Sequence, residues 1–186
     1  MTEIAERFHL PAQRSLATFM AAWARACGDN LEAELKTMEA EFPRVTVMGP
    51  IPVFYSGLLA GVRLEAGQAA QALELLNDVL KRVKEPNVGL YLPEIHRLRG
   101  ECLLRLDPTA IDDAVPEFET AIEIAEEQQA RIFQLAAAVS LARATAAAGR
   151  PQRGIAALSE IVGAFSDDHD APQLPLARTM LAGQRH

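Results

Sequence analysis

The side chains able to carry acid–base, nucleophilic or metal chemistry are few and scattered in this 186-residue sequence. The histidines stand far apart, without the spacing of metal ligands: His9, His96, His169 and His186. No phosphate-binding glycine motif, no G-x-S-x-G motif and no Cys-x-x-Cys pair occurs. Because no nucleophile is offered together with a base, we expect a protein that is not an enzyme and that needs no metal or cofactor.

Two polar features allow a more specific interpretation. Residues 167–170 place three aspartates around His169, which suggests a cation site, but we expect a solvated loop that caps the last helix. His96 stands between Glu94 and Arg97 near the start of a predicted helix. We expect it to form hydrogen bonds at the surface or between helices rather than to act in catalysis.

The composition indicates which kinds of partner and which cellular compartment to expect. The net charge of −7 disfavours general binding to nucleic acid or to anionic membranes, since both call for a basic surface. The amino-terminal residues are acidic where a signal peptide is basic, and no stretch reaches the roughly 18 apolar residues of a membrane span. Cys27 and Cys102 fall within apolar helical patterns, as small core residues do in a reducing compartment. We therefore expect a soluble, cytoplasmic protein.

The elements that must position these residues are predicted to be paired helices. In residues 93–129, apolar residues recur at spacings of 3 and 4 along two segments, separated by the turn-forming sequence Asp107-Pro108-Thr109. Two amphipathic helices joined in this way need neighbours of the same kind to bury their apolar faces. The rest of the chain repeats the pattern, with turns at Gly28, Gly67 and Gly149.

The repeat is visible in small residues at equivalent places before and after each turn. The small residues of the first helices are Ala21, Ala60, Gly100 and Ala142, and those of the second helices are Ala33, Ala72, Ala114 and Gly154. The first set recurs at intervals of 39, 40 and 42 residues, and its members are expected to let the two helices of a pair approach closely. A period of this length built from helix pairs is typical of an α-solenoid.

The predicted fold is thus all-α: a single domain over residues 1–186 that forms an α-solenoid, a right-handed superhelix of about four helix pairs with flanking helices. The pairs are expected at 12–42, 53–83, 93–129 and 131–165, with a capping helix at 173–183. Residues 43–52 carry two prolines around a Val45-Thr46-Val47 run. We predict a loop there, because an isolated strand would have nothing to pair with.

The small residue, the turn, the early alanine and a large residue four positions later resemble the tetratricopeptide (TPR) pattern. The last two positions are filled by Ala72 with Leu76, Ala114 with Phe118, and Gly154 with Leu158. The first pair departs from the pattern, because Thr37 stands where the large residue belongs. The period also exceeds the usual length of about 34 residues.

A more specific resemblance runs through most of the chain and is clearest from about Gly57 onward. It is carried by residues 94–101, 121–125, 135–142, 149–150 and 165–174. This series resembles the carboxyl-terminal TPR region of bacterial adenylate/guanylate cyclase–ATPase–TPR proteins and LuxR-type regulators. The resemblance implies a sensory or scaffolding segment of a signalling or transcriptional regulator. It does not decide whether the chain is a region of such a protein or a separate one.

The predicted binding surface is the concave face, which the first helices of such repeats line. The candidate residues on or near that face are Arg25, Arg97, Glu101, Arg105 and Arg143. Several arginines in one groove would attract an acidic protein or peptide. The alternative is that these arginines pair with nearby glutamates such as Glu65 and Glu101.

A second hypothesis is self-association as a homodimer. Large residues gather near the starts of two predicted first helices: Val53, Phe54, Tyr55, Leu90 and Tyr91. We expect these side chains to pack in the core, and an exposed patch of them would instead indicate a dimer interface.

The function that follows is a non-catalytic scaffold that binds a protein or peptide, with no direct contact to nucleic acid or membrane. The alternatives are a homo-oligomerisation module and a small-ligand sensor enclosed by the superhelix.

Overall fold

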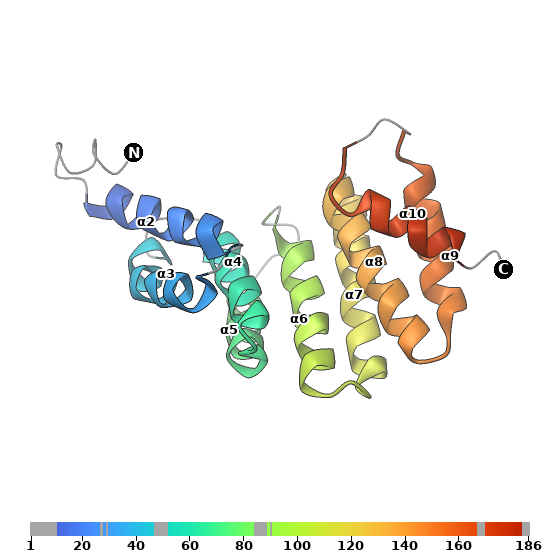
Figure 1. The fold of residues 1–186 in the computed structure, drawn as a ribbon, viewed down its shortest axis with the longest axis horizontal. Coiled ribbons are helices and arrows are strands. Elements are labelled where there is room, and N and C mark those ends of the chain that lie inside the picture. Colours follow the sequence, from blue (N-terminus) through green and yellow to red (C-terminus); the bar gives the residue numbers. More distant parts are fainter. Residues whose placement is uncertain are drawn as a thin grey trace. The chain divides into compact units, whose positions relative to one another are not determined.

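Helices follow one another along the chain (Figure 1). The structure, a computed structural model, describes residues 11–26, 28, 30–46, 52–83, 89, 91–166 and 170–183. Within these ranges every regular element is an α-helix and no strand occurs, which confirms the all-α prediction. None of the helices in this described part is both long and apolar enough to cross a membrane. The chain divides into two compact units, Met1–Lys84 and Glu85–His186.

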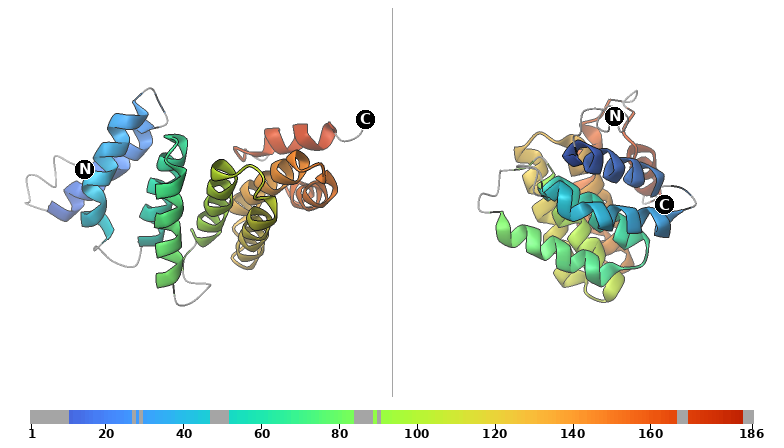
Figure 2. Two further views of the ribbon diagram at one scale, coloured as in Figure 1. Left: turned by 90° about the horizontal axis from the view of Figure 1, so that it is seen from below. Right: turned by 90° about the vertical axis from the view of Figure 1, so that its left-hand side faces the viewer.

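The first unit contains two consecutive helix pairs. They are α2 (Pro11–Ala26) with α3 (Leu31–Thr46), and α4 (Pro52–Glu65) with α5 (Ala69–Arg82). Each helix packs on the next, and α2 also contacts α4. Both views of Figure 2 show α2 and α3 side by side. The first helices of the two pairs in this unit are therefore neighbours, as in TPR-like repeats.

Aromatic packing joins the two pairs of the first unit. Phe19 on α2 is fully buried, and its ring lies 6.4 Å from that of Phe42 on α3 and 5.7 Å from that of Tyr55 on α4. The Tyr55 ring meets Phe19 edge-on, a geometry that aromatic pairs favour. Arg63 on α4 adds a 2.9 Å ion pair with Glu39 on α3.

The prediction of a loop at 43–52 is wrong for residues 43–46, which belong to α3, and for Pro52, which begins α4. Helix α3 continues past Pro43 to Thr46, although proline cannot donate the backbone hydrogen bond of a helix interior. Val45 explains the continuation, because its side chain is almost fully buried in the core of the unit. The Thr46 hydroxyl also donates to the carbonyl of Phe42 at 3.0 Å. Residues 47–51 lie outside the described part of the chain.

The second unit contains two further pairs and a final helix. They are α6 (Leu92–Leu106) with α7 (Ile111–Glu127), α8 (Arg131–Ala147) with α9 (Pro151–Gly163), and α10 (Leu174–Ala182). Each helix packs on the next, and α6 also contacts α8. The helix boundaries agree with the expected pairs to within about three residues.

Helix α8 is the centre of the second unit. Its residues contribute to two separate apolar clusters, one with α7 around Phe118 and one with α9 and α10 around Leu158 and Leu174. Because α8 is enclosed on several sides, ten of its residues are buried, and many of them are alanines. Small side chains let neighbouring helices approach α8 from more than one direction.

Small residues act as predicted in the second unit. A Cβ added at Gly154 on α9 would lie 2.5 Å from the Cα of Ala142 on α8, and one at Gly100 on α6 would lie 2.5 Å from the Phe118 ring on α7. Both helix pairs therefore use glycine for close contact. In the first pair the prediction is wrong, because Ala21 and Ala33 are exposed and the contact is made by other residues.

Two predicted turn glycines have the expected conformation. Gly67 after α4 and Gly149 after α8 have φ angles of 77° and 71°, in the left-handed region that favours glycine. The amide of Gln68 donates to the carbonyl of Arg63 at 2.8 Å, and that of Arg150 donates to Thr145 at 2.8 Å. These hydrogen bonds satisfy carbonyls at the ends of α4 and α8.

Candidate functional site

The structure brings three of the five predicted binding residues together. Arg97 and Glu101 lie on α6 and Arg143 lies on α8, so the contact between α6 and α8 joins them in one polar cluster. Arg105 is exposed one turn beyond Glu101 on α6. Arg25 lies in the last turn of α2 and belongs to the first unit.

Arg97 is held tightly by the carboxylate of Glu94, one turn earlier on α6. Its Nε donates to Oε2 of Glu94 at 2.7 Å and its Nη2 donates to Oε1 at 2.6 Å. This two-point geometry is among the strongest that arginine makes. Only 17% of the Arg97 side chain is exposed. Burial disfavours the charged form, but the hydrogen bonds to Glu94 and the charges of Glu94 and Glu101 raise the pKa of Arg97 overall.

Ser140 connects this ion pair to α8. Its hydroxyl donates to Oε1 of Glu101 at 2.6 Å, and it accepts a long 3.5 Å hydrogen bond from Nη1 of Arg97. The same Glu101 oxygen lies 3.7 Å from Nη1 of Arg97 and 4.0 Å from Nη1 of Arg143. We call Glu94, Arg97, Glu101 and Ser140 the α6–α8 network. Its groups satisfy one another across a helix interface.

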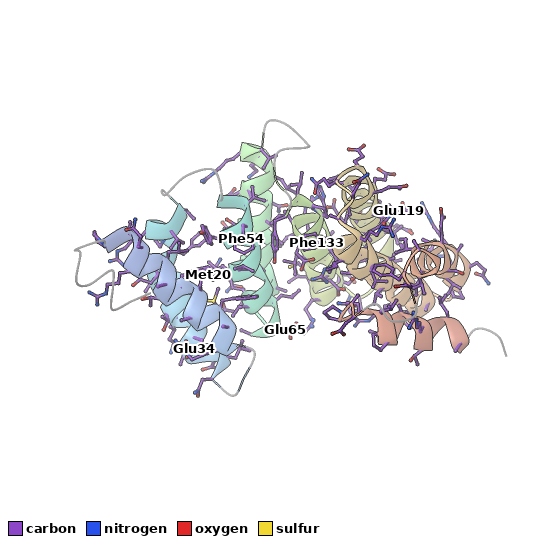
Figure 3. The ribbon with its side chains drawn as sticks, turned by 90° about the horizontal axis from the view of Figure 1, so that it is seen from above. Met20, Glu34, Phe54, Glu65, Glu119 and Phe133 are labelled. Atoms are coloured by element: carbon purple, nitrogen blue, oxygen red, sulfur yellow. The ribbon has the colours of Figure 1, made fainter. Side chains whose placement is uncertain are left out.

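Most of the predicted arginines therefore lie beside glutamates, which was the alternative to an arginine groove. Arg97 and Arg143 lie near Glu101, and Arg25 pairs with Glu34 at 2.8 Å. Figure 3 labels Glu34, whose pKa the hydrogen bond from Arg25 lowers. Glu65, the other carboxylate suggested from the sequence, takes part in none of the ion pairs found between described residues.

His96 lies between two helices, in agreement with the expected hydrogen-bonding role. Its Nδ1 is 3.0 Å from Oε2 of Glu117 on α7, and Arg99 forms an ion pair with the other oxygen of the same carboxylate. Burial would raise the pKa of Glu117, but the hydrogen bond with His96 and the charge of Arg99 lower it overall. The three side chains join α6 to α7.

A pocket of about 200 Å³ opens beside Glu94. Its walls come from the start of α6, the first half of α8 and the turn before α10. Tyr91 and Phe133 stand edge to face, with ring centres 5.4 Å apart, and Figure 3 labels Phe133 in the first turn of α8. The remaining walls are aliphatic apart from Gln173: Ile132, Leu135, Ala136, Ala171 and Pro172. Among the described residues that line the pocket, Glu94 is the only one with a charge.

A second pocket, of about 280 Å³, lies beside the start of α9. Two arginines border it, and each is engaged by a carboxylate on α7: Arg150 with Asp112 at 2.8 Å and Arg153 with Glu119 at 2.5 Å. The pairs are at the surface, where such interactions contribute little to stability.

Two parts of this region were not predicted from the sequence. Ser140 received no role, although a serine within an alanine-rich apolar helix is a signal of a buried hydrogen bond. The pocket walls came from three segments that are far apart in the sequence, and no spacing rule links them.

The remaining sequence candidates add no further site. Cys102 is buried, and desolvation together with the charge of Glu101 raises the pKa of its thiol to about 11. Among the described residues, no group of three or more histidine, cysteine, aspartate or glutamate side chains is arranged to hold a metal ion. Cys27, Leu90 and residues 167–169 lie outside the described part of the chain.

Comparison with protein-family models, with curated proteins and with solved structures gives no match to this chain.

Proposed function

We propose that this protein is a non-catalytic scaffold that binds a protein or peptide across the first helices of its helix pairs. It would serve as the regulatory or sensory TPR segment of a bacterial signalling or transcriptional regulator. The right-handed α-solenoid expected from the sequence is part of this proposal.

The observation that carries the proposal is the contact between successive first helices. In the second unit α6 lies against α8, and in the first unit α2 lies against α4. Neighbouring first helices form the ligand-binding surface of TPR-like arrays, whereas second helices form the opposite side. Arg105 and Arg143 project into solvent from α6 and α8 and are open to a partner.

The structure changes which of the predicted residues we expect to bind. Arg97 is committed to Glu94, so an acidic peptide would meet Arg105 and Arg143 rather than Arg97. The attraction is then weaker than that of an arginine-lined groove, because two exposed charges are screened by water and salt.

Site-specific photo-cross-linking tests this proposal. A photoreactive amino acid would replace Arg105, Arg143 or, as the control on a second helix, the exposed Glu123 of α7. We expect the same cellular protein to be captured from the native host through positions 105 and 143 and not through 123. Equal capture at all three positions, or none at any of them, would contradict the proposal.

Homo-oligomerisation is the alternative class. Of the residues suggested for it, Tyr55 packs on Phe19 within the first unit and Tyr91 packs on Phe133 within the second. Val53 and Phe54 are half-buried. Light scattering over a wide range of concentration separates this alternative from a monomeric scaffold.

A further inference from the structure

The geometry points to the pocket beside Glu94 as a binding site for a cationic side chain, arginine or lysine, of a partner protein. This inference rests on the proposed scaffold function and specifies the chemistry of the partner at one place. It differs from the sequence-based expectation of an acidic peptide, which concerned the arginines.

The charge of the pocket favours a cation. Glu94 is the only charged residue among the described lining residues, and Arg97 binds it without itself lining the pocket. The fork of Arg97 takes one hydrogen bond at each carboxylate oxygen, whereas a carboxylate can accept about four. Acceptor positions therefore remain for a second donor. Glu101, the other carboxylate of the α6–α8 network, lies near both Arg97 and the exposed Arg143, so Glu94 is the carboxylate that faces the pocket.

The walls fit the rest of such a side chain. Arginine and lysine bury their aliphatic stems on apolar surface while the charged end reaches a polar group. Ile132, Ala136 and Pro172 provide apolar wall, and Ile132 is 55% exposed and so accessible to a partner. The rings of Tyr91 and Phe133 add aromatic surface, which attracts a nearby cation.

Two further observations indicate that the site is already ordered before a ligand binds. Burial and the charge of Glu94 raise the pKa of Tyr91, so its ring stays a neutral phenol. Glu94 is fixed by Arg97, which Ser140 and Glu101 hold in turn. We assign Arg97 as a positioning residue for the Glu94 carboxylate. A site that is already ordered loses less entropy when a ligand binds.

An acidic side chain is the wrong occupant, because it would bring a second carboxylate against Glu94 in a partly buried place. A purely apolar side chain would use the walls but would leave the Glu94 acceptors without a new donor. The two alternatives make different predictions, so short peptides can distinguish them.

The experiment titrates the 186-residue protein, labelled with nitrogen-15, with capped pentapeptides Gly-Ala-Xaa-Ala-Gly in which Xaa is arginine, lysine, norleucine or glutamate. The readout is the set of backbone amide signals of residues 132–136, the segment of α8 that contributes Ile132, Phe133, Leu135 and Ala136 to the pocket wall. We expect saturable shifts with the arginine and lysine peptides, binding weaker by about fivefold or more with norleucine, and none with glutamate. Equal binding of the norleucine peptide, or no shift with any peptide, would overturn the inference.

Two variants locate the site. Ile132→Ala removes an exposed wall and should weaken binding of the arginine peptide by about fivefold or more, whereas Leu106→Ala, at a similarly exposed residue outside the pocket, should leave it unchanged. Glu94→Gln should abolish the preference for arginine over norleucine. If Glu94→Gln loses the folded spectrum, Ile132→Ala, Leu106→Ala and the peptide series still decide the question. Unchanged arginine-peptide binding in Ile132→Ala would place the peptide elsewhere and contradict the assignment.

Failure of this inference is distinct from failure of the proposed function. If cross-links at positions 105 and 143 capture a partner while the arginine peptide leaves residues 132–136 unmoved, the scaffold stands and the pocket assignment falls. If no partner is captured at either position, the scaffold proposal falls, whatever the peptides show.

Discussion

The hydroxyl of Ser140 on α8 donates a 2.6 Å hydrogen bond to Oε1 of Glu101 on α6. Only 4% of Ser140 is exposed, and the bond connects the first helices of two successive pairs. A buried hydroxyl and a carboxylate thus fix the interface from which the candidate site is built.

Replacing Ser140 with alanine tests this connection. The Ser140→Ala variant removes the hydrogen bond to Glu101, and we expect the free energy of unfolding to fall by about 1–2 kcal/mol. Urea denaturation measures the change. Ser159→Ala, at an exposed position on α9, is the control and should change stability by less than about 0.5 kcal/mol. Equal effects of the two substitutions would show that the bond contributes nothing.

Substitutions of Arg97 and Arg143 should differ in their effect on stability, although the sequence suggested the same role for both residues. Arg97→Met removes the buried charge that Glu94 and Glu101 share, so we expect a loss of about 3 kcal/mol in the free energy of unfolding. Arg143 is 64% exposed and 4.0 Å from its carboxylate, so Arg143→Met should cost less than about 0.5 kcal/mol. Chemical denaturation of both variants makes the comparison. Similar stabilities would mean that Arg97 is not structural.

The close contact of α8 and α9 predicts a large effect at Gly154. A Cβ there would meet the Cα of Ala142, and backbone atoms cannot move aside as a flexible side chain can. We expect Gly154→Ala to destabilise the protein by about 2–3 kcal/mol in a thermal or urea unfolding experiment.

Gly163 on the same helix is the matched control. Nothing lies within 4 Å of a Cβ added there, so Gly163→Ala should be neutral or should stabilise by up to about 1 kcal/mol through helix propensity. Destabilisation of the same size at both positions would contradict the close-contact explanation.

Because of the His96–Glu117–Arg99 cluster, we expect the stability of the protein to depend on pH in the acidic range. Because the pKa of Glu117 is lowered in the folded protein, its contribution is fully present above the unfolded carboxyl pKa of about 4.3 and is lost as the pH falls through the lower folded value. We expect Glu117→Gln to lose stability at about pH 6 and to lose less on going from about pH 6 to about pH 3 than the parent protein does.

The control for this pH series is Glu123→Gln, an exposed substitution on the same helix. Urea midpoints measured across the pH range should follow the parent protein for Glu123→Gln. If Glu117→Gln shows the full acid dependence of the parent, the cluster does not stabilise the contact between α6 and α7.

The positions of the helices were largely predictable because they depend on local patterns. Apolar spacing, proline near helix starts and glycine after helix ends act within a few residues of one another, as at Gly67 and Gly149. The end of α3 was predicted wrongly because tertiary burial of Val45 outweighs the local signal of Pro43. In the first pair, the small positions Ala21 and Ala33 fit the repeat in sequence but not the contact in space.

The sequence by itself determined the helix pairs, the glycine turns and the small residues of the second unit, because each of these follows from backbone preference and side-chain volume. Only the tertiary structure decided which charges meet. His96 and Arg99 on α6 meet Glu117 on α7, Ser140 donates to Glu101, and Tyr91 lies beside Phe133 through contacts between helices. Charge pairing and pocket walls depend on distances of a few ångströms between distant segments, and periodicity along one chain carries no information about such distances.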